Sequence, residues 1–284
     1  MLSIIKLTFR EILSRRIFFI TLLMTLAFLI FFGVTNHYAA QGFIQAMHGF
    51  DSANTVIQNS IRSQIIMMGL NFSSMILALL TILSTVGGVA GEIENHQIDT
   101  ILARPLPRRS YILGKFLGLG TVVVVYALSL FVGVLLINQL TGGDIAARLE
   151  PSSVVQGGLI FVLSPLLIVA AGLWLSTRMS TINSGIILII LYGVGFVGGL
   201  VEQIGTLLNN PSLINTGIIS SLIFPYNALF RKTDALLTDS GNSAMAMFNG
   251  GAGSEPSNLM LGYGVFYTVA LLFWAIRHFE GRDV

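Results

Sequence analysis

The sequence contains no cysteine, and only 10% of its 284 residues are charged. Without cysteine the chain has no disulfide framework, no thiolate metal site and no cysteine nucleophile. A soluble domain carries roughly 25% charged residues, so this chain has too few charges to solvate a globular surface. Hydrophobic residues make up 54% of it instead. This composition is typical of an integral membrane protein.

Most basic residues lie beside apolar runs, and the formal net charge is only +2. This distribution does not favour nucleic acid as a partner, because membrane proteins use such residues to fix their orientation. With six spans, the side that holds both termini carries most of the lysines and arginines. The other side holds Arg62, Arg148, Arg231 and Lys232. The charge bias therefore predicts a multi-pass protein of the cell membrane with both termini in the cytoplasm.

Six apolar runs have roughly the 17 to 25 residues that a helix needs to cross a membrane. They lie near Ile17 to Val34, Ile65 to Val89, Phe116 to Ile137, Val154 to Leu175, Ile182 to Val201 and Leu259 to Ile276. We expect an all-α integral membrane protein in which residues 1–284 form a single transmembrane domain. The fourth and fifth runs, read as one helix, would be about twice as long as the hydrocarbon core is thick. A turn at Arg178 is therefore expected between them.

The long polar interval 202–257 is expected to be an outer loop. It contains one short apolar segment, 213–224, which ends before Pro225. Such a segment is short for a span and is more typical of a re-entrant or interfacial helix.

The N-terminal residues 1–16 predict an amphipathic helix that lies in the membrane interface. An irregular basic tail is the alternative. The residues that define the predicted helix are Ile5, Phe9, Arg10, Ile12 and Leu13.

Several kinds of chemistry are missing from the sequence. It has no GxxxxGK[ST] motif, so the chain cannot hold nucleotide phosphates in a P-loop of its own. Its predicted spans carry almost no ionisable residues, which ion-coupled carriers and intramembrane enzymes need. His37 and His48 lie in a polar loop without a carboxylate cluster, so we expect neither a metal nor another cofactor. Energy for uphill transport would have to come from another polypeptide.

Pairs of glycines four residues apart allow helices to approach closely, either within one chain or between two copies. Gly114 and Gly118 form one such pair. Two further pairs are expected to serve helix packing: Gly87 with Gly91, and Gly195 with Gly199.

The connector 90–111, between the second and third spans, contains the stretch GEIENHQIDTILARPLPRR. Acidic residues come first and basic residues last, which complements a helix dipole. Ile98, Ile101 and Leu102 would form one apolar edge of a short helix, and Pro105 would end it. The connector is either a well-capped loop whose arginines face lipid headgroups, or a helix that docks into a soluble partner.

This connector resembles the first cytoplasmic loop of the ATP-binding-cassette (ABC) type-2 permeases. The resemblance lies in the acidic Glu92 and Glu94, the apolar stretch from Ile98 to Leu102, and the Ala103-Arg104-Pro105 step. It continues through Arg108 to Gly114-Lys115. One departure is His96-Gln97, where the family commonly has Gly-Thr.

The resemblance implies a permease subunit of an ATP-driven exporter. A second permease subunit, two copies of a separate ATPase subunit, and membrane lipids would be its partners. The connector would contain the coupling helix that binds the ATPase. Its contact residues would be Glu92, Glu94, Ile98, Ile101, Leu102, Arg104, Pro105 and Arg108. The alternatives are an ATP-independent channel or scaffold, and an intramembrane enzyme, for which no catalytic set falls within the spans.

Overall fold

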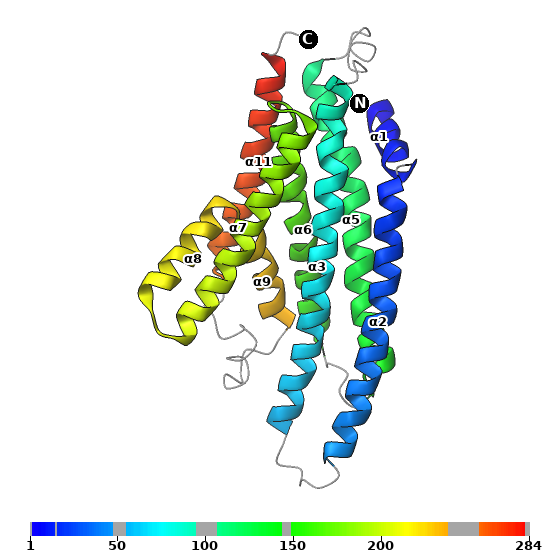
Figure 1. The fold of residues 1–284 in the computed structure, drawn as a ribbon, viewed down its shortest axis with the longest axis vertical. Helices are drawn as coiled ribbons and strands as arrows, with labels where there is room; N and C mark the ends of the chain where they lie inside the picture. Colours follow the sequence, from blue (N-terminus) through cyan, green and yellow to red (C-terminus); the bar gives the residue numbers. More distant parts are fainter. Residues whose placement is uncertain are drawn as a thin grey trace.

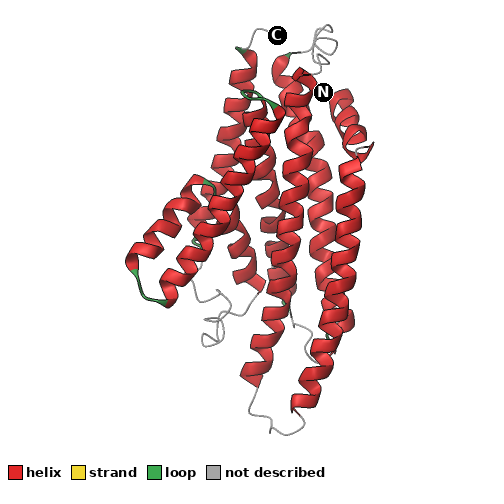
Figure 2. Ribbon diagram, viewed as in Figure 1, coloured by secondary structure: helices red, strands yellow, loops and turns green. Residues whose placement is uncertain are grey.

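The computed structural model describes residues 2–14, 16–47, 55–94, 107–143, 149–237 and 256–281. Within these ranges the ordered elements are helices, and no strand occurs in the described part of the chain (Figure 2). The helices are α1 (Leu2–Ser14), α2 (Arg16–Met47), α3 (Thr55–Glu94), α5 (Arg108–Thr141), α6 (Pro151–Ser176), α7 (Thr181–Leu207), α8 (Pro211–Ile223), α9 (Tyr226–Leu237) and α11 (Asn258–Glu280).

Six of these helices are long and apolar enough to cross a membrane: α2, α3, α5, α6, α7 and α11. They run roughly along the long axis of the molecule, and both chain ends lie at the same end of the bundle (Figure 1). We call the end that holds Leu2 and Gly281 the terminal end. The prediction of an all-α protein with six spans is confirmed.

Helix α6 is the centre of the bundle, where it packs against α3, α5, α9 and α11. In its most apolar stretch 67% of the residues are buried, compared with 17% in α2. The remaining apolar surface of α2 faces outward, as expected for a helix that contacts lipid. At the terminal end α6 stops at Ser176, and Arg178 lies in the short turn that leads to α7. The expected turn between the fourth and fifth spans is therefore present.

Residues 202–237, the described first part of the predicted outer loop 202–257, are largely helical. Helix α7 continues to Leu207, and α8 and α9 follow, bent by 109° at a break around Pro225. Proline ends α8 because it lacks an N–H and disfavours helical backbone in the residue before it. In Figure 1 α8 rises from the α7 turn to the middle of the bundle, and α9 descends from there. A pair bent in this way is either a broken span or a re-entrant loop, so the re-entrant arrangement of 213–224 stays a prediction.

Helix α1 packs along α5 at the terminal end through Ile4, Thr8 and Ile12, all of which are buried. A Cβ atom at Gly114 would lie 2.9 Å from Ile4, and one at Gly118 would lie 2.8 Å from Thr8, so these glycines seat α1. The residues that the sequence places on one apolar face of α1 therefore do not all point toward the bundle.

Of the residues that define the predicted amphipathic helix, Ile12 is buried against the protein and Phe9 is 40% exposed. Ile5 is half-buried and Arg10 is exposed. The side chain of Leu13 lies outside the described residues. Helix α1 therefore presents one apolar side to the bundle and another outward.

Candidate functional site

The last turn of α3 carries Glu92, whose carboxylate is buried at 4% exposure. Its Oε1 lies 2.5 Å from Nζ of Lys115 on α5, and its Oε2 accepts a hydrogen bond from the hydroxyl of Tyr111. Lys115 also lies 3.0 Å from a carboxylate oxygen of Glu11 on α1. These four side chains, Glu11, Glu92, Tyr111 and Lys115, form what we call the buried clamp. It connects α1, α3 and α5 at the terminal end.

Lys115 is completely buried. Removing an ammonium group from water costs several kcal/mol unless opposite charges and hydrogen bonds replace the water. Two carboxylates surround this ammonium group and supply that replacement. The buried Glu92 carboxylate holds the ends of α3 and α5 together. The sequence had suggested that Glu92 belongs to a surface that contacts the partner.

Glu94, two residues later, reaches across to the start of α7. Its Oε1 accepts a hydrogen bond from the backbone N–H of Thr181, and its Oε2 accepts one from the Thr181 hydroxyl, both at 2.8 Å. The N-cap residue Ser180 makes no side-chain capping bond, so Glu94 supplies the acceptor that this helix start lacks. A carboxylate at a helix N-terminus also complements the helix dipole. Glu94 thus caps the start of α7.

The start of α5 is tied to the C-terminus of α11. Arg108 donates a hydrogen bond to the backbone carbonyl of Glu280 at 3.2 Å, and Arg109 pairs with the Glu280 carboxylate. The ring of Tyr111 stacks on Phe279, with centroids 5.3 Å apart. Phe279 is completely buried, so this contact belongs to the core of the bundle.

The interval between the two anchored ends, residues 95–106, lies outside the described residues. It includes Ile98, Ile101, Leu102, Arg104 and Pro105 from the predicted coupling surface, together with His96-Gln97. The structure does describe the residues on either side of this interval. Before it, the end of α3 is held to α1, α5 and α7. After it, the start of α5 is held to α11. A force applied to residues 95–106 would therefore act on five helices.

A second buried ion pair, which the sequence pattern did not predict, connects α7 and α9. Arg231 on α9 contacts both carboxylate oxygens of Glu202 on α7, at 2.8 and 3.3 Å. Both side chains are nearly buried. A local signal could have shown that this interval is helical. Asn210 followed by Pro211 is an N-cap with proline in the first turn, which predicts the start of α8.

The glycines predicted to serve packing differ in their surroundings. A Cβ atom at Gly195 would lie 2.9 Å from the carbonyl oxygen of Phe224, and one at Gly199 would lie 2.1 Å from the amide nitrogen of Asn227. Both glycines face the break between α8 and α9. A Cβ atom at Gly91 would meet nothing closer than Thr181 at 3.9 Å. Gly87 is half-buried in α3.

Metal-binding groups do not gather in the described part of the chain, where no three His, Asp or Glu side chains are placed to hold an ion. His37 instead contacts the side-chain amide of Gln41, at 3.0 Å.

Comparison with protein families gives a match over nearly the entire chain. The model of the ABC-2 family transporter proteins matches residues 2–284. A comparison with curated proteins finds no significant match. The six membrane-spanning helices fit this family match. The chain therefore belongs to the ABC-2 family of transporter proteins and is a multi-pass membrane permease.

Proposed function

We propose that this chain is the membrane subunit of an ATP-driven exporter and that a separate ATPase subunit binds at the terminal end of the bundle. The terminal end would then face the cytoplasm, in agreement with the charge bias of the sequence. Because the sequence has no P-loop motif, ATP hydrolysis would take place on the partner.

The observation that carries this proposal is that the described residues on both sides of 95–106 are anchored to other helices. The buried clamp and the bonds from Glu94 to Thr181 hold the first end. The contacts of Arg108 and Arg109 with Glu280 hold the second end. A docking helix in this interval would move together with the ends of α3 and α5 rather than bend away from them. Such a connection is what mechanical coupling to an ATPase requires.

Within this proposal, Ile98, Ile101 and Leu102 contact the ATPase, and Arg104 and Arg108 pair with acidic residues of the partner or with lipid headgroups. A second permease subunit completes the pathway, and two ATPase subunits bind below the pair. Their ATP-dependent dimerisation would push the connectors and change access to the pathway. Membership of the ABC-2 family supports this assembly.

The proposal is tested by isolating the chain from its native membrane in a mild detergent. We expect a protein with a GxxxxGK[ST] motif to copurify, and we expect the reconstituted complex to hydrolyse ATP. A folded chain that copurifies with no ATPase and conducts solutes without ATP would contradict the proposal. That result would favour the channel alternative.

A further inference from the structure

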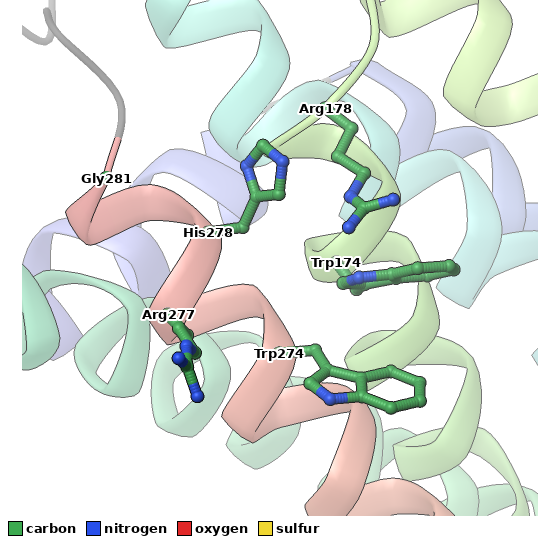
Figure 3. A pocket seen from close by; sticks show the side chains of 6 residues that line it. All are labelled: Trp174, Arg178, Trp274, Arg277, His278 and Gly281. Carbon is green, nitrogen blue, oxygen red and sulfur yellow. The ribbon is translucent and has the colours of Figure 1, made fainter.

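Both tryptophans of the sequence lie together at the terminal end, beside a group of basic side chains. Trp174 is on α6 and Trp274 on α11, with ring centroids 6.2 Å apart. They line a pocket of about 590 Å³, within the range of about 300 to 1,000 Å³ that is usual for ligand sites. Figure 3 shows the six residues that line it, namely Trp174, Arg178, Trp274, Arg277, His278 and Gly281.

The pocket combines cationic groups with aromatic walls. The guanidinium carbon of Arg178 lies 5.2 Å from the centroid of the Trp174 ring, a cation–π contact that holds the planar group in place. Arg277 and His278 face the pocket from the last turn of α11. None of the described residues that line the pocket is acidic, and no described carboxylate pairs with Arg178 or Arg277. The nearby Glu280 binds Arg109 instead.

A polar atom in the wall of the pocket is also without a partner. The indole Nε1 of Trp174 is buried and donates no hydrogen bond to any described residue. A buried donor in this condition is destabilising, and an acceptor bound in the pocket could satisfy it. In Figure 3 this nitrogen lies on the side of the ring that faces the pocket.

The outer surface of α11 leads directly to this pocket. Phe266, Val269 and Phe273 are exposed and recur at helical spacing on one side of the helix. Arg277 continues the same row one turn later. An apolar stripe that ends in a cation, with tryptophan at the boundary, matches the transition from acyl chains to headgroups at a membrane surface.

We propose that this pocket binds the phosphate headgroup of an anionic phospholipid. The phosphate oxygens would lie between Arg178 and Arg277, which bind phosphate through charge-assisted hydrogen bonds. The acyl chains would follow the exposed stripe of α11. A free phosphate ion shares the first part of this chemistry but does not use the apolar stripe. The proposal does not depend on coupling to an ATPase.

The two tryptophans make a direct experiment possible, because both line the pocket. The full chain is reconstituted in phosphatidylcholine nanodiscs in which a fixed fraction of the lipid carries brominated acyl chains. The brominated lipid is either phosphatidylglycerol or phosphatidylcholine. Bromine quenches tryptophan at short range, so quenching reports which headgroup occupies the pocket. We expect an apparent affinity about tenfold higher for phosphatidylglycerol, the scale of one or two charge-assisted contacts.

Substituting Arg178→Gln together with Arg277→Gln is expected to remove this preference. The matched control is Arg10→Gln, which removes an exposed charge from α1 at the same end without touching the pocket. If circular dichroism shows that the double variant does not fold, the exposed Arg277→Gln variant decides alone. Equal quenching by the two lipids, or a preference that survives the pocket substitutions, would overturn the proposal. So would saturable binding of inorganic phosphate without any lipid preference, since the site would then bind the free ion.

Discussion

Lys115 and Glu92 form an ion pair of 2.5 Å between α5 and α3, and the two side chains are 0% and 5% exposed. The pair lies where two membrane-spanning helices meet the connector that the family resemblance assigns to ATPase coupling. Glu11 brings α1 into the same cluster through its contact with Lys115. The buried clamp thus makes three helix ends a single mechanical unit.

Removing one partner of this pair should destabilise the protein more than replacing both partners with apolar residues. Lys115→Met leaves the buried Glu92 carboxylate without a cation, and we expect it to lower the free energy of unfolding by about 3 to 5 kcal/mol. Glu92→Leu leaves Lys115 with Glu11 alone, so its loss should be smaller. The double variant should recover much of the loss seen in Lys115→Met, because the two buried charges are removed together and the remaining Glu11 is partly exposed. Thermal unfolding of the purified protein in detergent measures the order of the three variants. Single variants as stable as the unmodified protein, or a double variant less stable than both, would contradict the account.

The bond between Glu94 and α7 can be tested by amide hydrogen exchange. Glu94→Ala removes the acceptor for both the backbone N–H and the hydroxyl of Thr181. The first turn of α7 should then exchange faster, while the interior of α7 keeps its protection. Thr181→Ala is the matched control, because it removes the hydroxyl and leaves the backbone donor. It should have the smaller effect, and equal exchange in the two variants would argue against capping by Glu94.

The sequence was sufficient to predict the spans and less informative about the helix ends. Long apolar runs predict membrane helices because the hydrocarbon core sets both length and polarity. The turn at Arg178 follows from the same reasoning. The clamp partners could not be predicted, because pairing Glu92 with Lys115 and Glu11 depends on how three helices are arranged in space. Glu202 and Arg231 were assigned to a polar loop, since a charge count cannot distinguish a buried pair from solvated residues.

Two glycines of the predicted packing pairs should respond differently to the same substitution. In Gly199→Ala the new methyl group would meet Asn227, which donates hydrogen bonds to the carbonyl oxygens of Gly195 and Phe196. Moving Asn227 breaks these bonds, so we expect a loss of about 1 to 3 kcal/mol in unfolding free energy. Gly91→Ala is the control, because its Cβ would have only ordinary contacts. Equal stability of the two variants would show that the α8–α9 break is not closely packed on α7.

The absence of native cysteine makes topology directly measurable. Ser180, Ser212 and Ser257 are exposed, and none of them makes a side-chain capping bond at its helix start. We expect an impermeant maleimide to label Ser212→Cys and Ser257→Cys from outside the cell. Ser180→Cys should be labelled only in inverted vesicles. Opposite sides for Ser212→Cys and Ser257→Cys would mean that 211–237 crosses the membrane, which contradicts the re-entrant arrangement.

The proposed contact between residues 95–106 and an ATPase can be tested by cross-linking. Ile101→Cys introduces one thiol into this interval, and a reagent that links it to lysines of a bound protein can be applied to intact membranes. The account predicts a cross-linked product that contains the chain and a protein with a GxxxxGK[ST] motif, and no such product from Ser257→Cys. Failure of Ile101→Cys to cross-link with an ATPase subunit in membranes that contain the complex, or equal cross-linking from Ser257→Cys, would contradict it.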